Sequence, residues 1–264
     1  AVVHKKAQLG IGVTIGPYAF VDSQVTLGDQ VTLDSHSHVT GKTTIGEGTR
    51  VWPFATLGSQ PQDLKYSGEN AILEVGSHNM FREYSNICIG TDGGGGSTKI
   101  GSHNLFMTNT HVAHDCIVGS HCIVSTASSL GGHVELDDYG IIGGHSACHQ
   151  FIKIGKHAFV GAFSLVAQDI APYVRVHGNH AIVKGINTEG LKRRGFSKED
   201  LGVLKGLYKT YFLSTLTASH AVQSIHDQFS ADHPIVREFC KFLDASTRGV
   251  CRKVGVSLSK PVQA

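Results

Sequence analysis

The chain has 264 residues, of which 41% are hydrophobic and 17% charged, and this composition excludes an intrinsically disordered protein. Lys and Arg number 23 against 21 Asp and Glu, so the net charge of +2 gives no sign of a nucleic-acid partner. The N-terminus has no apolar signal-peptide core, and the apolar stretch at 158–167 is too short to span a bilayer. The six cysteines contain no CxxC pair, which favours buried thiols in a reducing compartment, and we expect a cytoplasmic protein.

A six-residue repeat begins at Leu9 and runs through most of the chain. An apolar residue recurs in phase at Leu9, Ile15, Val21, Leu27, Leu33, Val39, Ile45, Val51, Leu57, Val75, Phe81 and Ile87, and in a shifted phase from Ile100 to Val166. A period of six fits no amphipathic helix. Glycine often follows the apolar position, as expected for short strands joined by tight corners. The repeat predicts a parallel β-solenoid of roughly eight or nine stacked coils.

Two insertions interrupt the repeat. The first covers Ser59–Ala71, and the second covers Thr91–Lys99 and contains the glycine run at 93–96. We expect both to project as loops, and loops on a rigid scaffold commonly carry function.

Several histidines recur about one predicted coil apart. His114, His133 and His149 are separated by 19 and 16 residues, and His111 lies three residues before the first. Strands stack about 4.8 Å apart, so we expect these side chains to line one edge, as a metal site or a general-base site. The other histidines at predicted turns, whose side chains we expect to be solvated, are His36, His38, His78, His103, His121 and His157.

After Val174 the repeat gives way to helical patterns. The segment Ser197–Asp200 resembles a capping box, and an apolar stripe follows from Leu201 to Phe212. Further helices are expected at 218–229 and 234–243, and the tail beyond Arg252 has no strong signal. We therefore divide the chain into a β-helix domain at 1–174 and a C-terminal helical domain at 175–264.

The repeat resembles that of the hexapeptide-repeat acyltransferases, which implies a mainly β fold, a left-handed parallel β-helix with three faces per coil. Five ordered segments are similar to the UDP-N-acetylglucosamine O-acyltransferases that begin lipid A synthesis: QDLKYSGE (62–69), HVAHDC (111–116), GHV (132–134), HQF (149–151) and NTEGLKRRGF (187–196). The resemblance implies transfer of an acyl or 3-hydroxyacyl chain from acyl carrier protein to the 3-hydroxyl of UDP-N-acetylglucosamine. It also implies a homotrimer, and no cofactor or metal beyond the carrier's own phosphopantetheine.

The resemblance further implies roles for individual residues. His114 matches the general base, Asp115 the residue that supports it, and the Gly132 N–H the oxyanion donor. Substrate contacts are implied for Gln62, Asp63, Lys65, His111, His133, His149, Gln150 and His180, and contacts with the nucleotide end for Asn187, Glu189, Arg193 and Arg194. Ala162 matches a position that sets acyl-chain depth, and we expect a slightly shallower pocket than glycine would give.

One departure and several alternatives accompany this resemblance. Cys88–Ile89 stands where the family usually has His-Arg, so a charged contact is lost. A zinc lyase like the γ-class carbonic anhydrases and a non-catalytic β-helix binding protein are alternatives. A third is the N-acyltransferase acting later in lipid A synthesis, which usually has an extra N-terminal domain that we do not expect here because the repeats begin by Leu9. The acceptor is either the ordinary sugar nucleotide or a 3-amino analogue.

Overall fold

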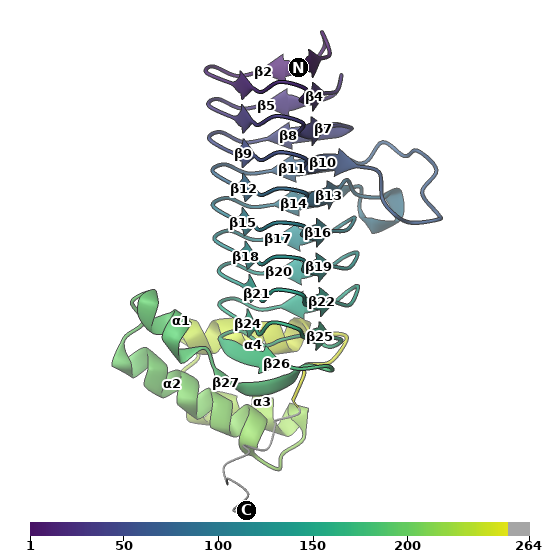
Figure 1. Ribbon diagram of the computed structural model, residues 1–264. Helices are drawn as coiled ribbons and strands as arrows, with labels where there is room; N and C mark the ends of the chain where they lie inside the picture. Colours follow the sequence, from purple (N-terminus) through teal and green to yellow (C-terminus); the bar gives the residue numbers. More distant parts are fainter. Residues whose placement is uncertain (253–264) are drawn as a thin grey trace, which may run out of the picture.

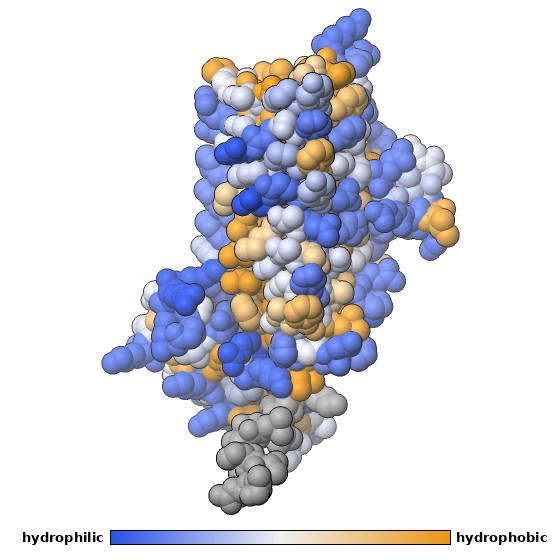
Figure 2. Space-filling model, viewed as in Figure 1, coloured by the Kyte–Doolittle hydropathy of each residue, from blue (hydrophilic) through white to orange (hydrophobic). Residues whose placement is uncertain are grey.

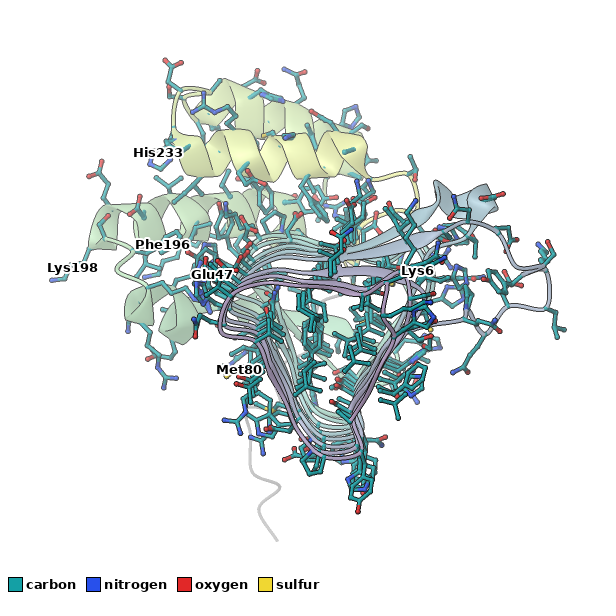
Figure 3. All side chains as sticks on the ribbon, turned by 90° about the horizontal axis from the view of Figure 1, so that it is seen from above. Lys6, Glu47, Met80, Phe196, Lys198 and His233 are labelled. Carbon is teal, nitrogen blue, oxygen red and sulfur yellow. The ribbon has the colours of Figure 1, made fainter. Side chains whose placement is uncertain are left out.

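The computed structural model describes residues 1–252 and forms a triangular column of short parallel strands with helices at one end (Figure 1). Successive strands enter three sheets in turn, and partners in neighbouring coils are eighteen residues apart in most of the column, as for Val2 and Phe20, whereas the insertions widen the spacing to 30 residues for Lys42 and Ile72. Seen from above, the three sheets enclose a filled core (Figure 3). The solenoid predicted from the six-residue repeat is confirmed.

The three sheets are named A, B and C in the order in which the chain enters them. Sheet A contains β1 (Val2–Val3), β4 (Phe20–Val21), β7 (His38–Val39), β10 (Thr56–Ser59), β13 (Asn86–Cys88), β16 (His111–Val112), β19 (Ser129–Leu130), β22 (Ala147–Cys148) and β25 (Leu165–Val166). Sheet B contains β2 (Gln8–Leu9), β5 (Thr26–Leu27), β8 (Lys42–Ile45), β11 (Ile72–Val75), β14 (Ser97–Ile100), β17 (Ile117–Val118), β20 (Glu135–Leu136) and β23 (Lys153–Ile154). Sheet C contains β3 (Thr14–Ile15), β6 (Thr32–Leu33), β9 (Arg50–Val51), β12 (Met80–Phe81), β15 (Leu105–Phe106), β18 (Ile123–Val124), β21 (Ile141–Ile142), β24 (Phe159–Val160), β26 (Val174–His177) and β27 (Ile182–Ile186), the last antiparallel to β26.

The repeated apolar residue of each strand points into the column. Leu33, Ile45 and Phe81 are fully buried, and Phe81 stacks on Phe106 of the next coil with ring centroids 4.9 Å apart. The exceptions lie in the first coil, which has no coil above it: Leu9 is 47% exposed, Val3 is 39% exposed and Ile15 is half-buried. Burying one such side chain per strand stabilises the stack by roughly 1.5–3 kcal/mol each.

At the corners between sheets, many residues have left-handed backbone and carry aromatic or imidazole rings. Because strands stack at the distance preferred by aromatic rings, these side chains form columns. One column contains His78, His103, His121, Tyr139, His157 and Tyr173, with neighbouring centroids 4.7–5.7 Å apart. The expected solvation is confirmed for His36, His38, His78, His103 and His121, which are exposed while their rings stack, and it is wrong only for His157. His36 stacks between Tyr18 and Phe54, His157 is buried, and His38 lies in β7, where it stacks on Phe20.

The helices cover one end of the column. They are η1 (Asp92–Gly94), which lies apart from the others in a loop, α1 (Thr188–Arg193), α2 (Lys198–Tyr208), the π-helical turn η2 (Lys209–Leu213), α3 (Ala218–Gln228) and α4 (Pro234–Ala245). The capping box is confirmed, since Ser197 and Asp200 exchange side-chain to backbone hydrogen bonds. No helix in the described part of the chain is long and apolar enough to cross a membrane. The domain boundary at residue 174 stays a prediction.

Candidate active site

Both insertions project from the edge where the chain passes from sheet A to sheet B, which we call the AB edge and define by Asp115, His133 and Phe151 in successive coils. The loops span 60–71 and 89–96, shorter than predicted because Ser59 belongs to β10 and residues 97–99 to β14. Figure 3 shows both loops on the side of Lys6, which lies between β1 and β2 at the same edge. The predicted catalytic histidine lies beneath these loops.

Asp115 is the centre of a hydrogen-bond network at this edge. Its fully buried carboxylate accepts from the Thr91 N–H at 2.8 Å and from the Thr91 Oγ1 hydroxyl at 2.6 Å. The Thr91 N–H binds Oδ1, whereas its hydroxyl binds Oδ2. Oδ2 also lies 2.7 Å from His114 Nδ1. A carboxylate only accepts hydrogen bonds, so Nδ1 carries the proton and the lone pair of His114 is on Nε2. This is the tautomer a general base needs.

Thr98 and Gly94 also hold Asp115 in place. Sequence reasoning identified neither Thr91 nor Thr98 as part of this network. The Asp115 N–H donates to Thr98 Oγ1 at 2.8 Å, which holds the left-handed corner. A Cβ added at Gly94 would run into the Asp115 carboxylate, so the glycine run lets the second loop pack directly over it.

Gly132 lies against the Cε1–Nε2 side of the His114 ring. A Cβ added at Gly132 would be 2.8 Å from Cε1 and 2.9 Å from Nε2 of His114, so only glycine fits here without a shift. The neighbouring N–H groups are engaged: Gly131 donates to Cys148 and His133 to His114. Among the described residues, the Gly132 N–H donates no hydrogen bond. It is therefore a free donor beside the imidazole.

Two more histidines, His133 and His111, lie beside the His114–Asp115 pair. The His133 ring stands edge-on to that of His114, with centroids 5.1 Å apart, and stacks on Phe151 at 4.2 Å. Burial lowers the pKa of His133, with a partial offset from the Asp115 carboxylate. His111 Nδ1 lies 3.0 Å from Asn86 Oδ1, and burial, then the nearby His114, lowers the pKa of His111. Both rings are neutral near pH 7.

A cavity of about 410 Å³ lies between the first loop and the edge. Its lining is Asp63, Lys65, Tyr66, Glu69, Thr91, Gly93, Gly94, His133 and Phe151. The predicted loop residues Asp63 and Lys65 thus meet His133, whereas Gln62 is exposed on the same loop and does not line the cavity. The cavity size is in the range of small-molecule sites.

His149 lies at the AB edge one coil beyond His133, with Gln150 exposed beside it. Its Nδ1 is 3.0 Å from the Gln150 carbonyl oxygen and 3.0 Å from a guanidinium nitrogen of Arg248. Arg248 also donates to the Ala167 carbonyl, so the segment after α4 brings a cation to this edge. Sequence reasoning did not identify Arg248, which is 99 residues from its partner.

The remaining predicted residues lie elsewhere on the same chain. Ala162 is exposed at the corner between sheets C and A, and His180 is exposed in the turn between β26 and β27. Asn187 caps α1 by accepting from Gly190 N–H and also donates to the His157 carbonyl, while Glu189 pairs with Lys192. Arg193 is exposed at the end of α1, and Arg194 lies 4.5 Å over the Tyr139 ring at the corner between sheets B and C.

Cys88 and Ile89, which replace the family's usual His-Arg, are buried under the first loop. The Cys88 Sγ lies 3.6 Å from Asn86 Oδ1, and burial raises the pKa of its thiol. All six cysteines are buried, as predicted.

Comparisons with known proteins identify the family. A family model described as UDP N-acetylglucosamine O-acyltransferase, domain 2, matches residues 169–251. A crystal structure of a UDP-N-acetylglucosamine acyltransferase is 38% identical over 97% of this chain and 98% of its own, with a TM-score of 0.93. LpxA from Acinetobacter baumannii is 41% identical over 95% and 97% of the two chains, with a TM-score of 0.92. LpxA from Moraxella catarrhalis is 35% identical over the same shares, also at 0.92.

These similarities extend over nearly the whole chain, and they confirm the predicted left-handed β-helix followed by C-terminal helices. The chain therefore belongs to the UDP-N-acetylglucosamine O-acyltransferase family and is an acyltransferase.

Proposed function

We propose that this chain transfers an acyl or 3-hydroxyacyl group from acyl carrier protein to the 3-hydroxyl of UDP-N-acetylglucosamine, the first step of lipid A synthesis. The relatives named for acylation of this sugar nucleotide support the reaction class. The observation that carries the mechanism is the adjacency of His114, held by Asp115, and the unengaged Gly132 N–H.

In this mechanism, His114 Nε2 removes the proton of the sugar 3-hydroxyl as its oxygen attacks the thioester carbonyl carbon. The imidazolium that forms is stabilised by the buried Asp115 carboxylate 2.7 Å from Nδ1. The carbonyl oxygen becomes an oxyanion and accepts a hydrogen bond from the Gly132 N–H, a contact worth about 10²–10³ in rate. The tetrahedral intermediate then collapses, the C–S bond breaks, and the carrier thiolate takes the proton from His114.

The transfer needs no cofactor in this scheme, because every proton and bond is supplied by the thioester, the hydroxyl and His114. Asp63 and Lys65, which line the cavity above His133, are proposed to contact the sugar and the acyl hydroxyl. His111 and His133, both neutral, provide polar lining around the acceptor. Arg248 and His149 are proposed to receive the donor end, where the carrier's phosphopantetheine brings a phosphate. The six cysteines are free and buried, which suits a reducing compartment, and we infer a cytoplasmic location.

We also propose a homotrimer with sites between chains. The residues implied for one site lie on three different edges of a single column: His114 between sheets A and B, Ala162 between C and A, and Arg194, the neighbour of Arg193, over the corner between B and C. One face of the column is up to about 20 Å across, too wide for one substrate group to contact two edges of one chain. Leu64 of the projecting loop is fully exposed, and Figure 2 shows an apolar tip on that loop, which suits burial against another chain.

Mixing two inactive variants tests the shared site. His114→Ala and Arg193→Ala are each unfolded and refolded alone, and then together. If His114 of one chain works with Arg193 of another, the mixture regains activity because hybrid trimers contain an interface with both native residues. Activity that stays absent in mixed trimers of verified composition would contradict a site shared between chains.

The reaction itself is tested with a panel of acyl carrier protein thioesters and radiolabelled UDP-N-acetylglucosamine, with the 3-amino analogue in parallel. Transfer to either acceptor supports the acyltransferase proposal, and the better acceptor and chain length give the specificity. Ala162→Gly removes one methyl group from the position implied to set chain depth. We expect it to shift the preference toward longer acyl chains by about 1–3 kcal/mol of transition-state free energy. No transfer from any donor by the folded protein would contradict the proposal.

A further inference from the structure

Three potential metal ligands converge at the AB edge. One potential ligand atom each from His114, Asp115 and His133 lies within 4.8 Å of the other two, and within residues 1–252 no other group of three or more His, Cys, Asp or Glu does so. His114 Nδ1 is 2.7 Å and His133 Nε2 3.8 Å from Asp115 Oδ2. Two imidazoles and a carboxylate are ligands that Zn²⁺ prefers.

The spacing requires only small shifts to hold the ion. Ligand atoms around tetrahedral Zn²⁺ lie about 2.0–2.1 Å from the metal, which puts them about 3.3 Å from one another. The two contacts made by Asp115 Oδ2, at 2.7 and 3.8 Å, each differ from this spacing by well under 1 Å. His133 lines the cavity of about 410 Å³, which gives the ion an entry path and leaves a fourth position for water or Asp63.

We propose that His114, Asp115 and His133 form a reversible inhibitory site for Zn²⁺. The inhibition rests on the proposed function of His114, whereas the binding does not. A metal on Nδ1 moves the imidazole proton to Nε2, because a neutral imidazole carries one proton. His114 then has no lone pair facing the substrate, and Asp115 no longer supports it. Zinc therefore blocks the base without having to occupy the substrate cavity.

The stacked histidines at the corner between sheets B and C provide a matched comparison. His103 and His121 face each other through their ring planes, with centroids 4.9 Å apart and planes 2° apart, so their lone pairs do not converge on one point. His121 and His133 both have left-handed backbone, at φ 60° and 61°, and asparagine tolerates that conformation. His133→Asn and His121→Asn are thus equivalent substitutions, one inside and one outside the proposed site.

The test measures zinc affinity directly, by competition with a chromophoric chelator, on chelator-treated full-length protein. We expect one site per chain with micromolar or tighter affinity, weakened at least about tenfold by His133→Asn and unchanged by His121→Asn. Equal affinity in the wild type and His133→Asn would overturn the site, as would the absence of binding in the folded wild type.

Acyl-transfer assays with zinc then test the inhibition. We expect zinc to inhibit the wild type at the concentrations at which it binds, and a chelator to restore the rate. Activity unaffected by bound zinc would overturn the inhibitory role. A protein that binds zinc through His133 but transfers no acyl group would retain the metal site while refuting the proposed reaction, so the two failures are distinguishable.

Discussion

The Nδ1 atom of His114 lies 2.7 Å from the Oδ2 atom of Asp115, the next residue in the sequence. Of the two residues, only Asp115 has a left-handed backbone. The contact depends on the left-handed backbone of Asp115 at φ 60°, which turns its side chain back toward the preceding residue. The sequence HD alone therefore does not specify this pair; the corner of the coil does.

Asp115→Asn is expected to lower kcat by at least about 100-fold. An amide cannot accept equally from Thr91 and His114, so His114 loses both its favoured tautomer and the stabilisation of its imidazolium. Acyl-transfer kinetics measure the effect, and circular dichroism checks that the column remains folded. A folded variant within threefold of the wild-type kcat would contradict the role of Asp115.

Thr91→Val removes one hydroxyl donor to Asp115 and keeps the backbone donor. A hydrogen bond to a charged group contributes about 1.5–3 kcal/mol, so we expect kcat to fall by roughly 10–100-fold. Thr91→Ser retains the hydroxyl and serves as the control, with activity close to that of the wild type. Equal rates in the valine and serine variants would show that the backbone N–H alone positions Asp115.

Gly132→Ala is expected to abolish measurable transfer while leaving the fold intact. The added methyl would stand 2.8–2.9 Å from the His114 ring, which must shift away from the reacting atoms. Gly202→Ala, on α2 with open space around its Cβ, provides a control in which activity is unchanged. The two variants are compared for transfer rate and for melting temperature, and normal transfer by Gly132→Ala would place the oxyanion elsewhere.

Stability should fall in mild acid because of His157. Burial, with Arg194 and Lys156 nearby, lowers its pKa from 6.5 to about 4, and it is only 7% exposed. The unfolded chain binds this proton below about pH 6.5 and the folded chain only near pH 4, so stability decreases as the pH falls between these values. Between pH 7 and pH 5, the free energy of unfolding of His157→Phe should fall by about 2 kcal/mol less than that of the wild type, as measured by urea unfolding. Parallel losses in the two proteins would refute this origin.

The fold was predictable because each six-residue step puts one apolar residue, such as Ile45 or Leu130, into the core. The same counting identifies corners, and it could have shown that Ala162 and His114 lie on different edges of one chain. The ring columns were not predicted, because the solvated interpretation considered each histidine without its neighbours eighteen residues away.

Thr91 and Arg248 could not be predicted from local patterns. Thr91 reaches Asp115 across 24 residues because the second loop folds back over a later coil, and only Gly94 permits that packing. Arg248 reaches His149 across 99 residues because the chain returns from α4 to the column. Both contacts depend on the path of a connection, which periodicity does not determine.

The most direct test of the central claim compares acyl transfer by the wild type, His114→Ala and His121→Ala. Both histidines lie at corners of the same β-helix, but only His114 is paired with Asp115 beneath the loops, whereas His121 stacks on His103 at the corner between sheets B and C. We expect His114→Ala to lower the rate at least about 100-fold and His121→Ala to leave it within about twofold. A folded His114→Ala enzyme that still transfers acyl groups at the wild-type rate would contradict the claim that this histidine is the base.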